Sequence, residues 1–274
     1  MDTGYHQRIR ETYNEWKTGD IDKGIVQFYK MYCEKHDYTS THNLGVLILY
    51  ENDFVPGCPS PMDLGTERLL AIDLLNAAEK LNPGREKNAL ALSLCYHFYK
   101  DYANSLSVLS LVKPEQLKND FLWMAAANHM VLSGYDQAQA LLKEIIDSDP
   151  DTVHLFWALY AMIYCRHINK ENTDEIMPDF RKCVTRIESE RETADPWYAA
   201  DIENMLISAI PFLLLFGESE DYRWLTEKQE ALMTDVEKEF LNKSSWQNRK
   251  EVDKEISEPW ASAKEIIFDL FEFG

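Results

Sequence analysis

The stretch that decides the fold of this chain is Gly134-Tyr135-Asp136-Gln137-Ala138-Gln139-Ala140-Leu141-Leu142, which continues to a proline at position 150. Two earlier stretches follow a similar pattern at nearly constant spacing. The small residues Ala71, Ser105 and Ala138 follow one another at intervals of 34 and 33 residues. A helical pattern with a period of about 34 residues is typical of stacked helix pairs, each of which buries its apolar face against its neighbours.

The same periodicity predicts helices along most of the chain. We expect them at about 5–16, 21–35, 41–51, 66–81, 87–100, 102–112, 119–132, 136–146, 152–166, 178–191, 196–216, 222–241 and 258–271. Gly19 suits a left-handed helix end, and Asp20 can cap the next helix. The stretch 53–61 holds three prolines and a glycine, which exclude helix there.

The best-matched unit runs from Leu122 to Pro150, with Ala126 in its first helix and Ala138 after the turn. These residues resemble the tetratricopeptide repeat family, and good matches cover residues 66–160. The resemblance implies an all-α, right-handed α-solenoid of about five to six antiparallel helix pairs with a C-terminal capping helix. Residues 1–217 would form the repeats and residues 218–274 a cap packed on the same solenoid, as a single domain.

The net charge of −19 is spread unevenly. Residues 1–118 carry 16 acidic and 13 basic side chains, a balance of −3, whereas residues 119–274 carry 31 and 15, a balance of −16. Such a field repels nucleic acid and anionic lipid and speeds encounter with basic partners. The other interpretation is simple solubility.

The cellular location is expected to be cytoplasmic. The start of the chain is polar and carries no secretion signal, and the longest apolar run, Ile207–Phe216, is too short to span a bilayer. Five cysteines make an odd number, and Cys95 and Cys165 lie inside apolar helical patterns where a reduced thiol packs as a small hydrophobe. We therefore expect no membrane partner.

In such a stack the first helix of each pair lines the concave face. We expect the partner-binding residues on that face. The 34-residue register places three rows of residues there: Leu90, Trp123 and Trp157; His97, Met130 and Tyr164; and an edge row of Lys87, Asp120 and His154. Exposed aromatic side chains in a groove are typical anchors for a partner helix or peptide. The candidate partner-binding residues are Trp123, Trp157, Tyr164, His97, Met130, Asp120, His154 and Leu90. The alternative is that one or both tryptophans are buried.

The residue types in these rows indicate which class of ligand would bind. Tetratricopeptide domains that hold acidic chaperone tails place Lys, Arg and Asn along the groove, whereas the rows here are apolar, aromatic or mixed in charge. This departure argues against capture of an acidic C-terminus and favours a basic or amphipathic ligand.

Catalytic and metal-binding patterns are poor. The seven histidines show no HExxH spacing, Cys33 and His36 form only half of a metal site, and Cys58 has no base paired with it in sequence. We expect no enzyme activity, no cofactor and no metal.

The leading hypothesis is a non-catalytic adaptor or inhibitor that binds one protein partner, which the acidic excess leads us to expect to be basic. By analogy of charge and fold alone, it is similar to bacterial immunity proteins that neutralise basic toxins. A peptide-sensing regulator is the second hypothesis, and an enzyme that uses Cys58 in the proline-rich loop is the third. The oligomeric state is left open.

Overall fold

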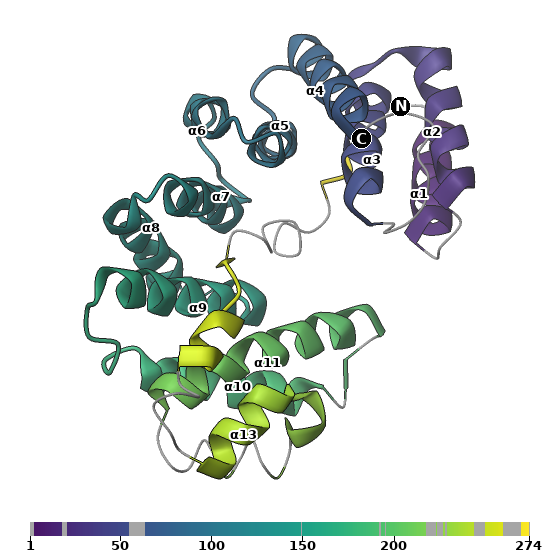
Figure 1. Cartoon of the computed structure of the whole chain (residues 1–274). Helices are drawn as coiled ribbons and strands as arrows, with labels where there is room; N and C mark the ends of the chain where they lie inside the picture. Colours follow the sequence, from purple (N-terminus) through teal and green to yellow (C-terminus); the bar gives the residue numbers. More distant parts are fainter. Residues whose placement is uncertain are drawn as a thin grey trace. The chain divides into compact units, whose positions relative to one another are not determined.

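The computed structural model describes residues 3–17, 21–54, 64–148, 150–191, 193–194, 196–217, 223, 227, 229–243, 250–259 and 270–273. Every regular element within these ranges is helical and none is a strand, which confirms the all-α prediction (Figure 1). From α1 to α6, and again from α8 to α11, each helix packs against the next. The chain divides into two compact units, unit 1 (residues 1–128 and 267–274) and unit 2 (residues 129–266). The expected boundary at residue 217 lies inside unit 2.

Unit 1 contains the first six helices and most of the seventh. They are α1 (Thr3–Lys17), α2 (Ile21–Lys35), α3 (Tyr38–Phe54), α4 (Leu64–Leu81), α5 (Glu86–Phe98), α6 (Tyr102–Leu111) and α7 (Lys118–Val131), which crosses the boundary at residue 128. Within the pairs, α1 packs on α2, α3 on α4 and α5 on α6. Contacts of α2 with α3, and of α4 with α5, join successive pairs.

Unit 2 contains the remaining elements. They are α8 (Tyr135–Asp147), α9 (Thr152–Asn169), α10 (Met177–Glu190), α11 (Pro196–Phe216), the 3₁₀ turn η2 (Glu230–Leu232), α13 (Asp235–Lys243) and the 3₁₀ turn η3 (Asp253–Glu255). Neighbours in this order from α8 to α11 pack on one another, and α13 and η3 pack on α11.

The small residues that the pattern singles out are buried. Ser93, Ser105, Ala126 and Ala138 are all fully buried. The hydroxyl groups of Ser93 and Ser105 lie 2.7 Å apart and hydrogen-bond between α5 and α6. A small side chain at each of these places lets two helices approach closely.

The sequence prediction of one helix over 222–241 is wrong, because α13 starts anew at Asp235. The main-chain N–H of Thr234 donates to the carboxylate of Glu237 at 2.7 Å, and the N–H of Glu237 donates to the Thr234 hydroxyl at 3.2 Å. This reciprocal capping box satisfies two main-chain donors at a helix start and so separates α13 from η2.

The expected final helix over 258–271 is wrong at its C-terminal end, where Leu270 and Phe271 have no regular secondary structure. Most of the stretch lies outside the described residues. So do Gly19, Asp20 and residues 55–61, including Cys58. The expectation that the stretch 53–61 excludes helix is wrong at its start, since α3 continues to Phe54.

One stretch of the described residues, Tyr198–Phe216 in α11, is long and apolar enough to cross a membrane. More than half of it is buried inside the protein, as in the core helix of a soluble protein. This finding is consistent with a soluble chain.

Candidate functional site

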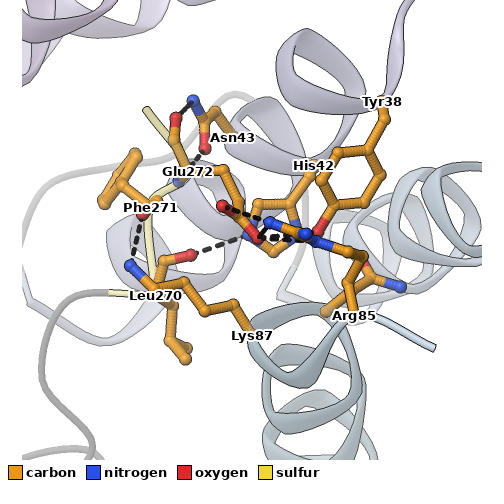
Figure 2. Close-up of polar contacts among 9 residues, drawn as sticks. Tyr38, His42, Asn43, Arg85, Lys87, Leu270, Phe271 and Glu272 are labelled. Carbon is orange, nitrogen blue, oxygen red and sulfur yellow. Dashed lines mark hydrogen bonds and ion pairs between the residues drawn. The ribbon is translucent and has the colours of Figure 1, made fainter. Parts of the chain in front are cut away.

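The candidate site lies in unit 1, where the last described residues, Leu270–Phe273, lie against α3 and the start of α5. We call these four residues the C-terminal segment. The side chains that hydrogen-bond it form the segment site: Tyr38, His42, Asn43, Arg85 and Lys87. Figure 2 shows these side chains gathered around Leu270, Phe271 and Glu272.

Asn43 binds the main chain of Glu272 in both directions. Its amide nitrogen donates to the Glu272 carbonyl at 2.8 Å, and its amide oxygen accepts from the Glu272 N–H at 2.8 Å. A carboxamide carries a donor and an acceptor side by side, so it pairs with a peptide group much as a neighbouring strand does. This contact recognises main chain and does not depend on the side chain at position 272.

Two further main-chain carbonyls of the segment accept hydrogen bonds from unit 1. The Lys87 ammonium donates to the Phe271 carbonyl at 2.7 Å, and Nε2 of His42 lies 2.7 Å from the Leu270 carbonyl. The carbonyls of Leu270, Phe271 and Glu272 thus each have a different side-chain donor.

His42 is held in place by a second, fully buried polar group. Its Nδ1 lies 3.0 Å from Oδ1 of Asn88, and the amide nitrogen of Asn88 donates to the Leu75 carbonyl and to Glu79, both at 3.1 Å. Burial lowers the pKa of His42, against the opposing effect of its hydrogen bonds to Leu270 and Asn88. The neutral ring is therefore favoured, and we assign its single proton to Nε2, which makes the shorter contact. Both ring nitrogens face oxygen acceptors, so Nδ1 can donate to Oδ1 of Asn88 only when the ring is protonated.

The Glu272 carboxylate is recognised by Arg85 and Tyr38. Nη2 of Arg85 donates to both carboxylate oxygens at 3.1 Å, and the Tyr38 hydroxyl donates to Oε1 at 3.1 Å. Only 12% of the Glu272 side chain is exposed, so this charge-assisted pair is partly shielded from water. Burial, together with the negative charge of Glu272, raises the pKa of Tyr38, which keeps the hydroxyl protonated as a donor.

Apolar contacts surround the aromatic side chains of the segment. Phe271 is buried, and its ring centroid lies 5.1 Å from that of Tyr13, 5.6 Å from that of Phe28 and 6.0 Å from that of Tyr50. The Phe273 ring lies edge-on to Tyr13 at 5.2 Å, with the Lys87 ammonium 5.9 Å from its centroid. Tyr13 therefore contacts both rings.

Local chemistry at two turns positions the site. His36, in the left-handed conformation (φ 47°), ends α2, and the Asp37 carboxylate accepts from the Ser40 N–H at 2.8 Å to cap α3. Tyr38 and His42 then lie one turn apart with rings stacked at 5.5 Å. Gly84 adopts φ 77° between α4 and α5, a conformation that glycine permits at little cost.

That second turn brings Arg85 to the N-cap of α5 and Lys87 into its first turn. The carboxylate of Glu79, near the end of α4, accepts from the Gly84 N–H at 2.8 Å and steadies the turn.

The eight residues predicted from the 34-residue register are placed mostly inside the units. Leu90, His97, Asp120 and Trp123 are buried in unit 1, and Met130, Trp157 and Tyr164 are buried in unit 2. The His154 side chain is 11% exposed. Both tryptophans are therefore buried, which is the alternative that the pattern left open. For Trp157 the physical reason is that α8 and α10 pack on α9. Leu90 and His97 are covered in the same way, because α3, α4 and α6 pack on α5.

In unit 2, residues 250–259 also cover α9. The Tyr160 hydroxyl donates to the Ser257 carbonyl at 2.8 Å, and Nε2 of His167 lies 2.7 Å from the Asp253 carboxylate. Side chains that face such neighbours offer a partner no surface in this conformation.

Sequence reasoning missed most of the segment site. Of the edge row, Lys87 does contact the segment. The signal that could have found the rest is a polar run at the start of α3, where Ser40, Thr41, His42 and Asn43 are buried despite their polarity. Buried polar side chains need hydrogen-bond partners, and such a run indicates that something binds there.

Metal and nucleophile chemistry finds little support in the described part of the chain. Within it, no group of three or more His, Cys, Asp or Glu residues is placed to hold a metal ion. Burial raises the pKa of Cys165 and of Cys183 to about 12, so both thiols stay protonated near neutral pH.

No protein-family model matches this chain, and a search of curated proteins finds no similar one.

Proposed function

We propose that this protein acts by binding, not by catalysis, and that the segment site of unit 1 holds an extended segment of protein chain. The observation that carries the proposal is the pairing of the Asn43 amide with both the N–H and the carbonyl of Glu272. We further propose that the packed helix pairs form a right-handed, tetratricopeptide-like solenoid, as the 34-residue period implies.

Main-chain recognition supports a peptide ligand. Donors on three side chains serve three successive carbonyls, and this arrangement suits any chain that adopts the same extended path. Burial of Leu270 and Phe271 adds specificity for apolar side chains, at about 1.5–3 kcal/mol for each fully buried side chain.

The charge of this site changes the expected ligand. Arg85 binds the carboxylate of Glu272 and Lys87 binds the carbonyl of Phe271, so the segment held here is acidic and aromatic. This proposal departs from the expectation that the chain does not capture an acidic tail, because the Lys, Arg and Asn of this site come from outside the two central rows. Binding of a basic partner, including immunity-type inhibition of a toxin, remains a prediction for other surfaces that rests on the acidic excess of residues 119–274.

A peptide titration of the full chain tests the proposal. The peptide has the sequence of residues 266–274, carries a fluorophore at its N-terminus, and is added to a Phe271→Ala protein whose own segment is weakened. We expect saturable binding that Asn43→Asp weakens by about tenfold or more, because a carboxylate cannot donate to the peptide carbonyl.

Asn104→Asp in α6 is the matched control, since this exposed asparagine lies in the same unit and bonds only locally to Asp101 in the described structure. Equal affinity of the Asn43→Asp and Asn104→Asp proteins for the peptide would contradict the proposal, as would no binding at millimolar peptide.

A further inference from the structure

Building on that proposed function, we infer that the segment site selects a partner segment of the pattern apolar–aromatic–acidic–aromatic, and that Leu270–Phe273 is a resident competitor which such a segment displaces. The partner is a segment of another protein with an acidic side chain between two aromatic ones.

The aromatic position before the acid is selected by an enclosed set of rings. Phe271 stacks on Phe28 and Tyr50, with interplanar angles of 29° and 13°, and meets the edge of Tyr13 at 62°. These are favourable geometries for aromatic pairs, so a flat ring fits better than a branched aliphatic side chain. A short side chain at this position would leave a void.

The acidic position is selected by a planar cation. The guanidinium of Arg85 spans both oxygens of Glu272, and Nε adds a third contact at 3.3 Å. Its carbon also lies 5.7 Å from the Tyr38 ring centroid, which helps to orient the planar group. An uncharged glutamine would keep the shape and lose the charge-assisted bonds, and a lysine would be repelled.

The second aromatic position lies at the rim. Phe273 is half-buried, with the Tyr13 edge on one side and the Lys87 ammonium near its face. Lys87 therefore does two things, since it also donates to the carbonyl of Phe271. A ring at this position gains a cation–π contact that an aliphatic side chain does not.

Displacement follows from how the segment is held. Its main-chain groups are held by hydrogen bonds from His42, Lys87 and Asn43, which an incoming segment can replace one for one. A partner segment of the same chemistry at sufficient concentration therefore occupies the site in its place.

The test uses full-length proteins and labelled peptides of the sequence 266–274. The proteins are the wild type and two variants with weakened segments, Phe271→Ala and Glu272→Lys. If one variant fails to fold, the other still allows the measurement. The peptides are the native sequence, a Glu272→Gln peptide and a Phe271→Ala peptide. Fluorescence anisotropy measures each affinity, and sedimentation velocity measures the oligomeric state.

We expect the native peptide to bind both weakened proteins at least tenfold more tightly than the wild type, because the resident competitor is then lost. The Glu272→Gln and Phe271→Ala peptides should each bind the Phe271→Ala protein about tenfold less tightly than the native peptide. Adding Arg85→Gln to that protein should abolish the difference between the native and Glu272→Gln peptides. Arg186→Gln in α10 is the matched control, since it removes another exposed Arg–Glu pair, that with Glu190.

The possible results separate this inference from the proposed function. If no peptide binds any protein, the proposed function fails, and this inference with it. If all three peptides bind alike, the function stands and the ligand pattern is wrong. If wild-type and weakened proteins bind the native peptide equally, displacement is wrong. A concentration-dependent dimer that requires Phe271 and is dissociated by the peptide would identify the occupant as a second copy and overturn the assignment to another protein.

Discussion

A methyl group placed on Gly45 of α3 would lie 2.9 Å from Cγ of Leu75 in α4. Leu75 is itself fully buried, so its side chain has little room to move aside. The two helices therefore approach as closely as a glycine permits. This contact lies two residues from Asn43 and helps to hold α3 where the C-terminal segment binds.

We predict that Gly45→Ala destabilises the protein by about 1–3 kcal/mol through overpacking, despite the higher helix propensity of alanine. Urea unfolding followed by circular dichroism measures the change. Gly134→Ala is the control: there the nearest atom to the new methyl group is the end of the Gln137 side chain, at 3.1 Å. A loss of equal size in both variants would show that the close approach of α3 and α4 is not the cause.

Two substitutions of Trp123 distinguish the effect of its side-chain volume on stability from the effect of its indole N–H group. The side chain is 1% exposed, and its Nε1 has no hydrogen-bond partner in the described structure. We expect Trp123→Ala to cost about 3–5 kcal/mol through loss of volume. Trp123→Phe should cost much less, because it also removes an unsatisfied buried donor. Chemical denaturation of both variants measures these costs, and a Phe variant as unstable as the Ala variant would contradict this prediction.

Acid should weaken unit 2 through Asp151, the N-cap of α9. Its carboxylate accepts from the N–H groups of Val153 and His154, both at 3.0 Å. Burial opposes ionisation, but the hydrogen bonds and charge of His154 outweigh it and lower the pKa of Asp151 to about 2.

Because the pKa of Asp151 is lower in the folded state than its ordinary value of 3.8, its contribution to stability is present above pH 4 and is lost as pH falls toward 2. We predict that Asp151→Ala costs about 0.5–2 kcal/mol at pH 7 and that the difference from wild type shrinks between pH 4 and pH 2. Urea unfolding at a series of pH values measures this, and a difference independent of pH would contradict it.

The capping box of α13 makes a prediction for the C-terminal part of unit 2. Thr234→Ala removes the hydroxyl that accepts from the Glu237 N–H and should destabilise the protein by about 0.5–2 kcal/mol. Thr234→Ser keeps the hydroxyl and should be nearly neutral. Hydrogen exchange of the α13 amides is the measurement, with faster exchange expected in the Ala variant alone.

The sequence predicted much of the helical framework from local signals. The predicted helix over 21–35 matches α2, and that over 196–216 matches α11. The break at Gly84 was also predicted, since caps, turns and apolar periodicity act between residues a few positions apart. The missed break at Asp235 was local too, because the Thr234–Glu237 capping box is a readable signal.

The partner-binding site was predicted from the repeat period instead of from local signals. In the structure most of its residues lie in the interior. The 34-residue register predicted equivalent positions for Trp123 and Trp157, and both side chains are buried. The register cannot tell whether another helix or a later part of the chain covers those positions, since that depends on packing between elements distant in sequence.

The sequence by itself determined that this chain is helical and where most helices begin and end, because both follow from interactions within a few turns of chain. Only the tertiary structure decided that Asn43 pairs with Glu272, 229 residues away, and that a cationic site in unit 1 holds an acidic, aromatic segment. No local preference couples residues so far apart. Their contact forms because buried main-chain groups and a partly buried carboxylate need partners, and the folded helices supply them.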